Sequence, residues 1–133
     1  MGILIDSSVL ITIERGRLEM EELFAQAPGE DWCIAAITAA ELLVGFHRAD
    51  LSMRDSRSQF IETLFRRLVV VNFDLPAARV YAKLSSQLAS TGAPVGLHDL
   101  QIAATAIVRD DQIATLDRRS FPRIEGVRLF PLT

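Results

Sequence analysis

Residues 1–11 read MGILIDSSVLI, and this stretch decides the fold. The apolar run ILI at 3–5 is typical of a short buried strand. Asp6 follows it at once, and the apolar residues that resume after two serines predict a helix with Ser7 or Ser8 as its cap. A carboxylate beside a core costs free energy unless something compensates its charge. The stretch therefore raises the question of what Asp6 does.

The composition indicates one globular domain. The chain has 133 residues, half of them hydrophobic and 23% charged, which is enough for a single core. Cys33 is the only cysteine, so no internal disulfide is possible and a reducing compartment fits. We find neither a signal peptide nor an apolar run long enough to span a bilayer. We expect one domain over residues 1–133, located in the cytoplasm and not associated with a membrane.

The charge of the chain does not by itself indicate nucleic-acid binding. The formal net charge is −3, and the basic residues are almost all arginine, with Lys83 the single lysine. Arginine suits planar, bidentate contacts with phosphate. A genome rich in arginine codons would give the same bias, so both explanations stay open.

Strand patterns alternate with helix patterns along the whole chain. The segment 51–59 looks like a polar connection or part of a helical arm, and residues 61–68 place their apolar residues on one helix face. One apolar, unbroken strand after another, separated by helices, predicts a parallel sheet covered on both faces. The predicted strands are 3–5, 31–37, 68–73, 112–116 and 127–132. The predicted helices are 7–15, 18–27, 38–50, 77–88 and a buried helix over 100–108. The helix over 77–88 is expected to end near Gly92-Ala93-Pro94.

Four acids lie where predicted strands pass into helices. Asp6 and Asp117 follow strands directly, Glu41 lies one helical turn beyond a strand, and Asp99 opens the helix over 100–108. The carboxyl ends of parallel strands meet at one edge of a sheet, and the loops that follow them gather there. If the strands are parallel and adjacent, the four carboxylates converge.

Each acid taken alone has an ordinary structural explanation. Asp6 and Asp117 could cap helices, Thr38 and Glu41 could form a capping box, and Asp99 could favour the positive end of its helix. Capping, however, does not require an acid at every such junction. Four carboxylates together need raised pKa values or a bound cation, and oxygen-only ligands select Mg²⁺ or Mn²⁺.

Four segments resemble the signature segments of one family in order and spacing. ILIDSSVLI, ITAAELLVG, GLHDLQIAATAI and IATLDRRSFPRI are similar to those of PIN-domain ribonucleases, and in particular of the VapC-like toxins of bacterial toxin–antitoxin pairs. The resemblance implies a three-layer α/β/α domain with a central parallel sheet. It also implies a catalytic quartet that holds the metal, made of Asp6, Glu41, Asp99 and Asp117, with Ser7 and Thr115 as polar helpers.

The resemblance further implies an activity and partners. The activity would be hydrolysis of RNA phosphodiesters with Mg²⁺, or Mn²⁺, and the partners a small inhibiting antitoxin and a second copy in a homodimer. Arg118 and Arg119 follow Asp117 and could contact RNA phosphates, although a solvated loop explains them equally well. The alternative function is a non-catalytic PIN-fold module that acts through protein or DNA contacts. The presence of all four acids favours the enzyme.

Other classes of phosphate-handling protein fit less well. A dehalogenase-type phosphotransferase needs a second Asp two residues after the first, where this chain has Ser8. A receiver domain needs an acidic pair near its start and a lysine near its end, but Lys83 is the only lysine. A dinucleotide or P-loop fold needs a glycine-rich first turn, which DSSV is not.

Overall fold

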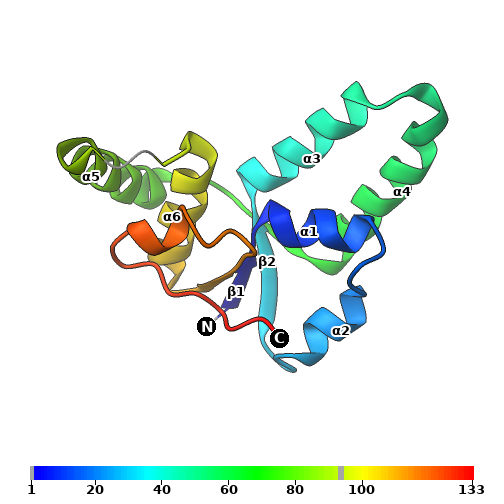
Figure 1. Ribbon diagram of the computed structural model, residues 1–133, viewed down its shortest axis with the longest axis horizontal. Helices are drawn as coiled ribbons and strands as arrows, with labels where there is room; N and C mark the ends of the chain where they lie inside the picture. Colours follow the sequence, from blue (N-terminus) through cyan, green and yellow to red (C-terminus); the bar gives the residue numbers. More distant parts are fainter. Residues whose placement is uncertain (1, 93–94) are drawn as a thin grey trace.

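A four-stranded parallel sheet forms the centre of the molecule, as the computed structural model, which describes residues 2–92 and 95–133, shows (Figure 1). Its order is β3-β2-β1-β4, so β1 lies inside the sheet. The register pairs Ile3 of β1 with both Trp32 of β2 and Gln112 of β4. This confirms the predicted parallel sheet. The strands are β1 (Gly2–Ile5), β2 (Asp31–Ala35), β3 (Val69–Val71) and β4 (Gln112–Ala114).

Helices cover both faces of the sheet. Figure 1 shows α5 and α6 on one side, and α1 and α2 on the other, with α3 and α4 extending as a helical arm. Side chains alternate along a strand, so Leu4 packs towards α5 and α6, while Ile3 and Ile5 pack towards α1, α2 and α4. The predicted three-layer architecture is confirmed. The helices are α1 (Ser7–Glu14), α2 (Met20–Ala25), α3 (Ala36–Arg48), α4 (Leu51–Arg67), α5 (Leu75–Thr91) and α6 (Leu97–Arg109), followed by the 3₁₀ turn η1 (Phe121–Arg123).

Two strand predictions are wrong in ways that the topology explains. Residues 68–73 were expected to form a buried strand, but β3 has three residues, and the exposed fraction of Val69 is 63%. The cause is its place at the edge of the sheet, where it pairs only with β2. Residues 127–132 form no strand; Leu129 makes a single parallel bridge with Ile113, and this segment covers the outer edge of β4.

The boundaries of α4, α3 and α5 can be compared with the prediction. The polar segment 51–59 belongs to α4, which runs unbroken from Leu51 to Arg67. β2 ends at Ala35, so α3 begins two residues before Thr38, and Thr38 is not a helix cap. α5 ends at Thr91 as expected, with Gly92 in the left-handed conformation; Ala93 and Pro94 of the predicted helix end lie outside the described residues.

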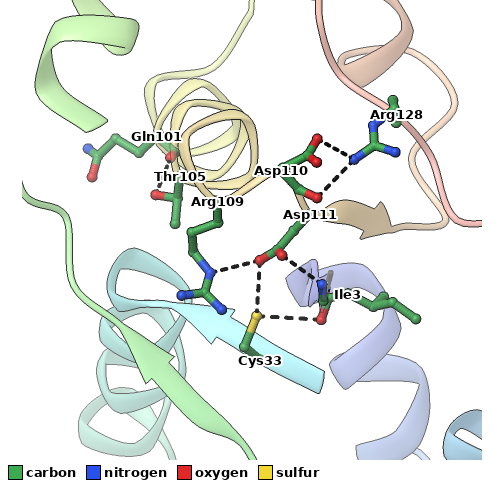
Figure 2. Close-up of polar contacts among 9 residues, drawn as sticks. Ile3, Cys33, Gln101, Thr105, Arg109, Asp110, Asp111 and Arg128 are labelled. Carbon is green, nitrogen blue, oxygen red and sulfur yellow. Dashed lines mark hydrogen bonds and ion pairs between the residues drawn. The ribbon is translucent and has the colours of Figure 1, made fainter. Parts of the chain in front are cut away.

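A polar cluster around Asp111 anchors the amino ends of the strands (Figure 2). The buried Asp111 carboxylate accepts hydrogen bonds from the Gly2 N–H (2.9 Å) and from Arg109 Nε (2.8 Å), and the Cys33 thiol lies 3.6 Å away. A side chain at position 2 would meet Asp31 O at 2.9 Å, so glycine is required there. Burial and the Asp111 charge raise the pKa of the Cys33 thiol to about 12, which keeps it protonated and unreactive.

No helix within residues 2–92 and 95–133 has the length and apolarity needed to cross a membrane.

Candidate active site at the carboxyl edge of the sheet

Asp6 is held by hydroxyl groups and does not cap α1. It stands at the N-cap position with an extended backbone, but its side chain makes no capping hydrogen bond. Instead its Oδ2 accepts hydrogen bonds from Ser8 Oγ and Thr115 Oγ1, each at 2.8 Å. The residue is buried, with an exposed fraction of 4%. Capping therefore does not explain why a carboxylate follows β1.

Thr115 links two of the four acids. Its hydroxyl donates to Asp6 and accepts the backbone N–H of Asp117 at 2.9 Å. Ser8 supports the same junction, because its Oγ accepts the N–H of Leu116 at 3.0 Å. Thr115 thus lies where the prediction put it. Ser8 was missed, although a hydroxyl two residues after an acid is a recognisable local hydrogen-bonding pattern.

Ser7, the other predicted helper, lies elsewhere on this edge. It makes no hydrogen bond to Asp6; the serine that does is Ser8. Ser7 is half-buried and lines a pocket of about 220 Å³ together with Glu41. Its role as a polar helper stays a prediction.

Asp117 remains ionised because the following loop folds around it. Its Oδ1 accepts the backbone N–H groups of Arg119 (2.8 Å) and Ser120 (3.2 Å). The hydrogen bond from Arg119 is the main reason that the pKa of Asp117 is lowered, and the bonds from Ser120 add to it. A carboxylate that accepts several N–H bonds keeps its negative charge. The contact of Ser120 with Asp117 was not predicted from the sequence. The only signal for it is that a polar residue stands three positions after Asp117.

Asp99 lies within electrostatic range of the three other predicted acids. It lies in the first turn of α6 and is half-buried. Burial is the main cause that raises its pKa, and the negative charges of Asp6, Asp117 and Glu41 raise it further, against a lowering by the Ser120 hydroxyl. The interaction between two charges weakens with their separation. Asp6, Asp117 and Glu41 are therefore near enough to Asp99 to affect its pKa, and their joint role as one site stays a prediction.

Glu41 reaches this edge from the interior of α3. Its side chain is about one-third exposed, and its Oε2 lies 3.3 Å from Nδ1 of His98 in the first turn of α6. The capping box suggested by TAAE is wrong, since the residue at the N-cap is Ala35. Glu41 is thus a member of the acidic group that faces outward towards His98.

The donor atoms fit a hard divalent cation, but their present arrangement does not enclose one. Carboxylate and hydroxyl oxygens are the ligands that Mg²⁺ and Mn²⁺ prefer. Burial and the nearby negative charges raise the pKa of Asp99, and a bound cation would lower it again by favouring the ionised carboxylate. Within the described residues, however, no three His, Cys, Asp or Glu side chains are arranged to hold a metal ion. Occupation of the site would therefore need side chains to move.

Arg118 and Arg119 lie beside Asp117 on the exposed loop that precedes η1. The Arg119 charge contributes to the lowered pKa of Asp117. Among the described residues, neither guanidinium forms a hydrogen bond or an ion pair within 4 Å. Their role in binding substrate stays a prediction.

Known proteins resemble this chain over nearly its whole length. The sequence profile of the PIN domain matches residues 3–127. Ribonuclease VapC of Rickettsia bellii (strain RML369-C) is 35% identical over 125 residues, which are 93% of this chain and 91% of that protein. The chain belongs to the PIN-domain family.

Two further relatives place it among the VapC-type members of the PIN-domain family. The tRNA(fMet)-specific endonuclease VapC of Salmonella typhimurium is 36% identical over 98 residues, 73% of this chain and 72% of that protein. The crystal structure of DNA-bound VapBC from Salmonella typhimurium superposes with a TM-score of 0.88 at 29% identity, covering 98% of this chain and 97% of that chain. These likenesses confirm the predicted family, the fold and the assignment as a toxin endoribonuclease.

The electrostatic coupling within this PIN-domain site can be tested directly. Because the Asp117 charge raises the pKa of Asp99, Asp117→Asn should lower the pKa of Asp99. Carboxyl ¹³C chemical shifts of the metal-free protein, followed against pH, measure it. Asp74→Asn is the matched control, since Asp74 caps α5 and is not among the groups that shift Asp99. An unchanged Asp99 titration in Asp117→Asn would show that the two acids do not share a site.

Proposed function

We propose that Asp6, Glu41, Asp99 and Asp117 bind Mg²⁺, with Mn²⁺ as an alternative, and that this chain uses them to hydrolyse RNA phosphodiesters. The observation that supports the proposal is that the Thr115 hydroxyl hydrogen-bonds both Asp6 and the Asp117 backbone, with Asp99 and Glu41 within electrostatic range. Uncompensated negative charges at one edge would cost stability without any gain unless they served a ligand. A non-catalytic PIN module would need none of the four, so the enzyme is the better explanation.

Each of the four acids would have a role that follows from its position. Asp6 is fixed by two hydroxyl groups and Asp99 is half-buried in α6, so these two would be the inner oxygen donors. Asp117 and Glu41 stand at the rim, where substrate enters. A bound divalent ion supplies polarisation of the phosphate and activation of a water nucleophile. The water oxygen bonds to phosphorus while the bond to the 3′ oxygen breaks, so the products carry a 5′-phosphate and a 3′-hydroxyl.

Arg118 and Arg119 are proposed to hold the RNA backbone beside Asp117. Their guanidinium groups are exposed, and arginine forms bidentate contacts with phosphate. They would offset the repulsion between an anionic substrate and the acidic group. The substrate would be a single-stranded or looped RNA segment, whose backbone can reach a shallow edge site.

We also propose that the cell restrains this activity with a small antitoxin, and that the toxin is a homodimer. The support for a partner is the likeness to a VapBC structure from Salmonella typhimurium. An antitoxin side chain of positive charge, such as arginine, would match the acidic group that the coupling of Asp99 reveals.

The sharpest test of the metal site is Asp99→Asn. It keeps the size of the side chain and removes one charge from the acidic group. Nuclease activity should be lost. Mg²⁺ should stabilise the wild type by about 2.7 kcal/mol at 100 times its dissociation constant, and should stabilise the variant much less. Thermal melts with and without metal measure this, with Asp74→Asn as the matched control. Equal metal-induced shifts in wild type and variant would remove Asp99 from the site.

The same variant has a predictable effect on metal-free stability. The folded protein holds the Asp99 proton more tightly than the unfolded chain does, since its pKa is raised. The ionised form therefore costs stability as pH rises through the folded pKa of Asp99. Near neutral pH, metal-free Asp99→Asn should be at least as stable as the wild type. The difference should disappear below the ordinary Asp pKa of about 3.9.

The arginine pair is tested by changing Arg118 and Arg119 to Ala together. RNA binding should weaken, and the slope of log K against log salt should fall by about 1.4 if each arginine contacts one phosphate of a single strand. Arg17 and Arg66, which are exposed on other parts of the surface, provide a matched double-alanine control. An unchanged salt slope in the Arg118–Arg119 variant would show that neither side chain contacts an RNA phosphate.

The toxin role is tested by growth. Expression of this chain alone should arrest growth, and co-expression with the small open reading frame next to its gene should restore it. Asp99→Asn expressed alone should permit normal growth, which controls for overexpression. Equal growth of cells expressing the wild-type chain with and without the neighbouring frame would contradict the antitoxin proposal and leave the fold untouched.

A further inference from the structure

Thr38 carries a polar atom that the fold leaves without a partner. The residue is fully buried in the first turn of α3, and its hydroxyl forms no hydrogen bond among the described residues. The helical threonines Thr12, Thr63 and Thr105 behave differently, because each donates to the carbonyl four residues earlier. For Thr38 that residue is Ile34, which lies in β2 and pairs with Val70. The usual partner is therefore unavailable.

A buried hydroxyl without a partner costs about 1–3 kcal/mol, so its retention calls for an explanation. Thr38 lies three residues before Glu41, and residues with this spacing share one helix face. Helical side chains lean towards the N-terminus of their helix, which here is the carboxyl edge of the sheet. β1 and β2 end side by side at this edge, since Leu4 pairs with Cys33. Thr38 and Glu41 therefore share a face of α3 close to the carboxyl ends of β1 and β2.

Glu41 does not use this hydroxyl in the present structure. Its Oε2 lies instead 3.3 Å from His98 Nδ1, in a contact whose two side chains are 34% and 54% exposed. The acidic group is coupled electrostatically, yet no three of its members are arranged to hold an ion. The outward position of Glu41 is one reason, because its carboxylate is directed to the rim.

We propose that Glu41 has two positions: an outer one beside His98, seen here, and an inner one in which the Thr38 hydroxyl donates a hydrogen bond to its carboxylate. A divalent cation at the acidic group favours the inner position, and His98 favours the outer one. Thr38 is therefore a positioning residue that acts through Glu41. This inference rests on the proposed metal site, and an ion can shift the two positions only by its differential affinity for them.

The test is Thr38→Val, which keeps the shape of the side chain and removes the hydroxyl. The metal-free variant should melt at the same temperature as the wild type or higher, because an unsatisfied polar atom is gone. Its dissociation constant for Mn²⁺ alone, measured by the electron paramagnetic resonance of free Mn²⁺, should rise about tenfold, which corresponds to about 1.4 kcal/mol. Thr38→Ser should restore wild-type affinity.

Thr105→Val is the matched control. Thr105 is also a buried helical threonine, but its hydroxyl is satisfied by the Gln101 carbonyl at 2.8 Å, and it lies towards the Asp111 cluster (Figure 2). This control should lose stability and keep its Mn²⁺ affinity. Thr38→Val is thus expected to lose Mn²⁺ affinity without losing stability, and Thr105→Val to lose stability without losing Mn²⁺ affinity.

Changes at His98 should act in the opposite direction on Mn²⁺ affinity. His98→Ala removes the outer contact, so Glu41 should turn inward more readily and Mn²⁺ should bind more tightly. His98→Asn places an amide N–H near the position of Nδ1 and should keep the wild-type affinity. If Thr38→Val does not fold, Thr38→Ala carries the same expectation for Mn²⁺ affinity.

The outcomes separate this inference from the proposed function. Wild-type Mn²⁺ affinity in Thr38→Val, or a failure of Thr38→Ser to restore it, would overturn the Thr38 proposal while leaving the metal site intact. A wild-type protein that binds no Mn²⁺ would overturn the proposed function, and the Thr38 proposal with it. Weakened binding in Thr38→Val together with tightened binding in His98→Ala would support the two positions of Glu41.

Discussion

Repulsion among four carboxylates at one edge of the sheet is the constraint on which the rest of the account depends. The parallel register makes it unavoidable, because β1 lies between β2 and β4 and the strands deliver Asp6, α3 and the Asp117 loop to the same edge. α6 adds Asp99 from the side. Burial raises the pKa of Asp99, and the negative charges of the other three acids raise it further. Perturbed carboxyl groups gathered at the end of a sheet are typical of functional sites.

The opposite edge of the sheet shows how the same chain treats a structural acid. Asp111 is buried, and Arg109 and the Gly2 N–H neutralise and bind it (Figure 2). At the carboxyl edge, Asp6 is held by neutral hydroxyl groups, and among the described residues no Arg or Lys forms an ion pair with Asp6 or Asp99. The acid at one edge is therefore paired with an arginine, whereas Asp6 and Asp99 at the other edge have no such partner among the described residues.

Much of the fold and the acidic group could be predicted because both follow from local patterns. Apolar runs located β1, β2 and β4, and the acids after them are the predicted site residues. The burial of β3 was harder to predict. Its composition matches an interior strand, but the sheet order that exposes Val69 is set by contacts between distant segments. The helix boundary at Ala36 could not be read either, since DWCIAAI continues the apolar pattern across it.

The supporting hydroxyl groups were the least predictable part of the site. Ser7 and Ser8 are neighbours of the same type, and only the three-dimensional position of Thr115 shows that Ser8 completes the junction with Asp6. The sequence offers Thr38 as a possible helix cap, whereas the structure buries it without a partner. Sequence reasoning finds groups that carry charge, and the structure is needed to find the neutral groups that place them.

The most direct measurement of the central claim is a crystal structure of the wild-type protein soaked in Mn²⁺, with anomalous data collected at the manganese absorption edge. The account predicts an anomalous peak bound by Asp6 and Asp99, with Glu41 or Asp117 within reach of the same ion. A peak at another place on the molecule, or none at a Mn²⁺ concentration that supports cleavage of RNA, would contradict it.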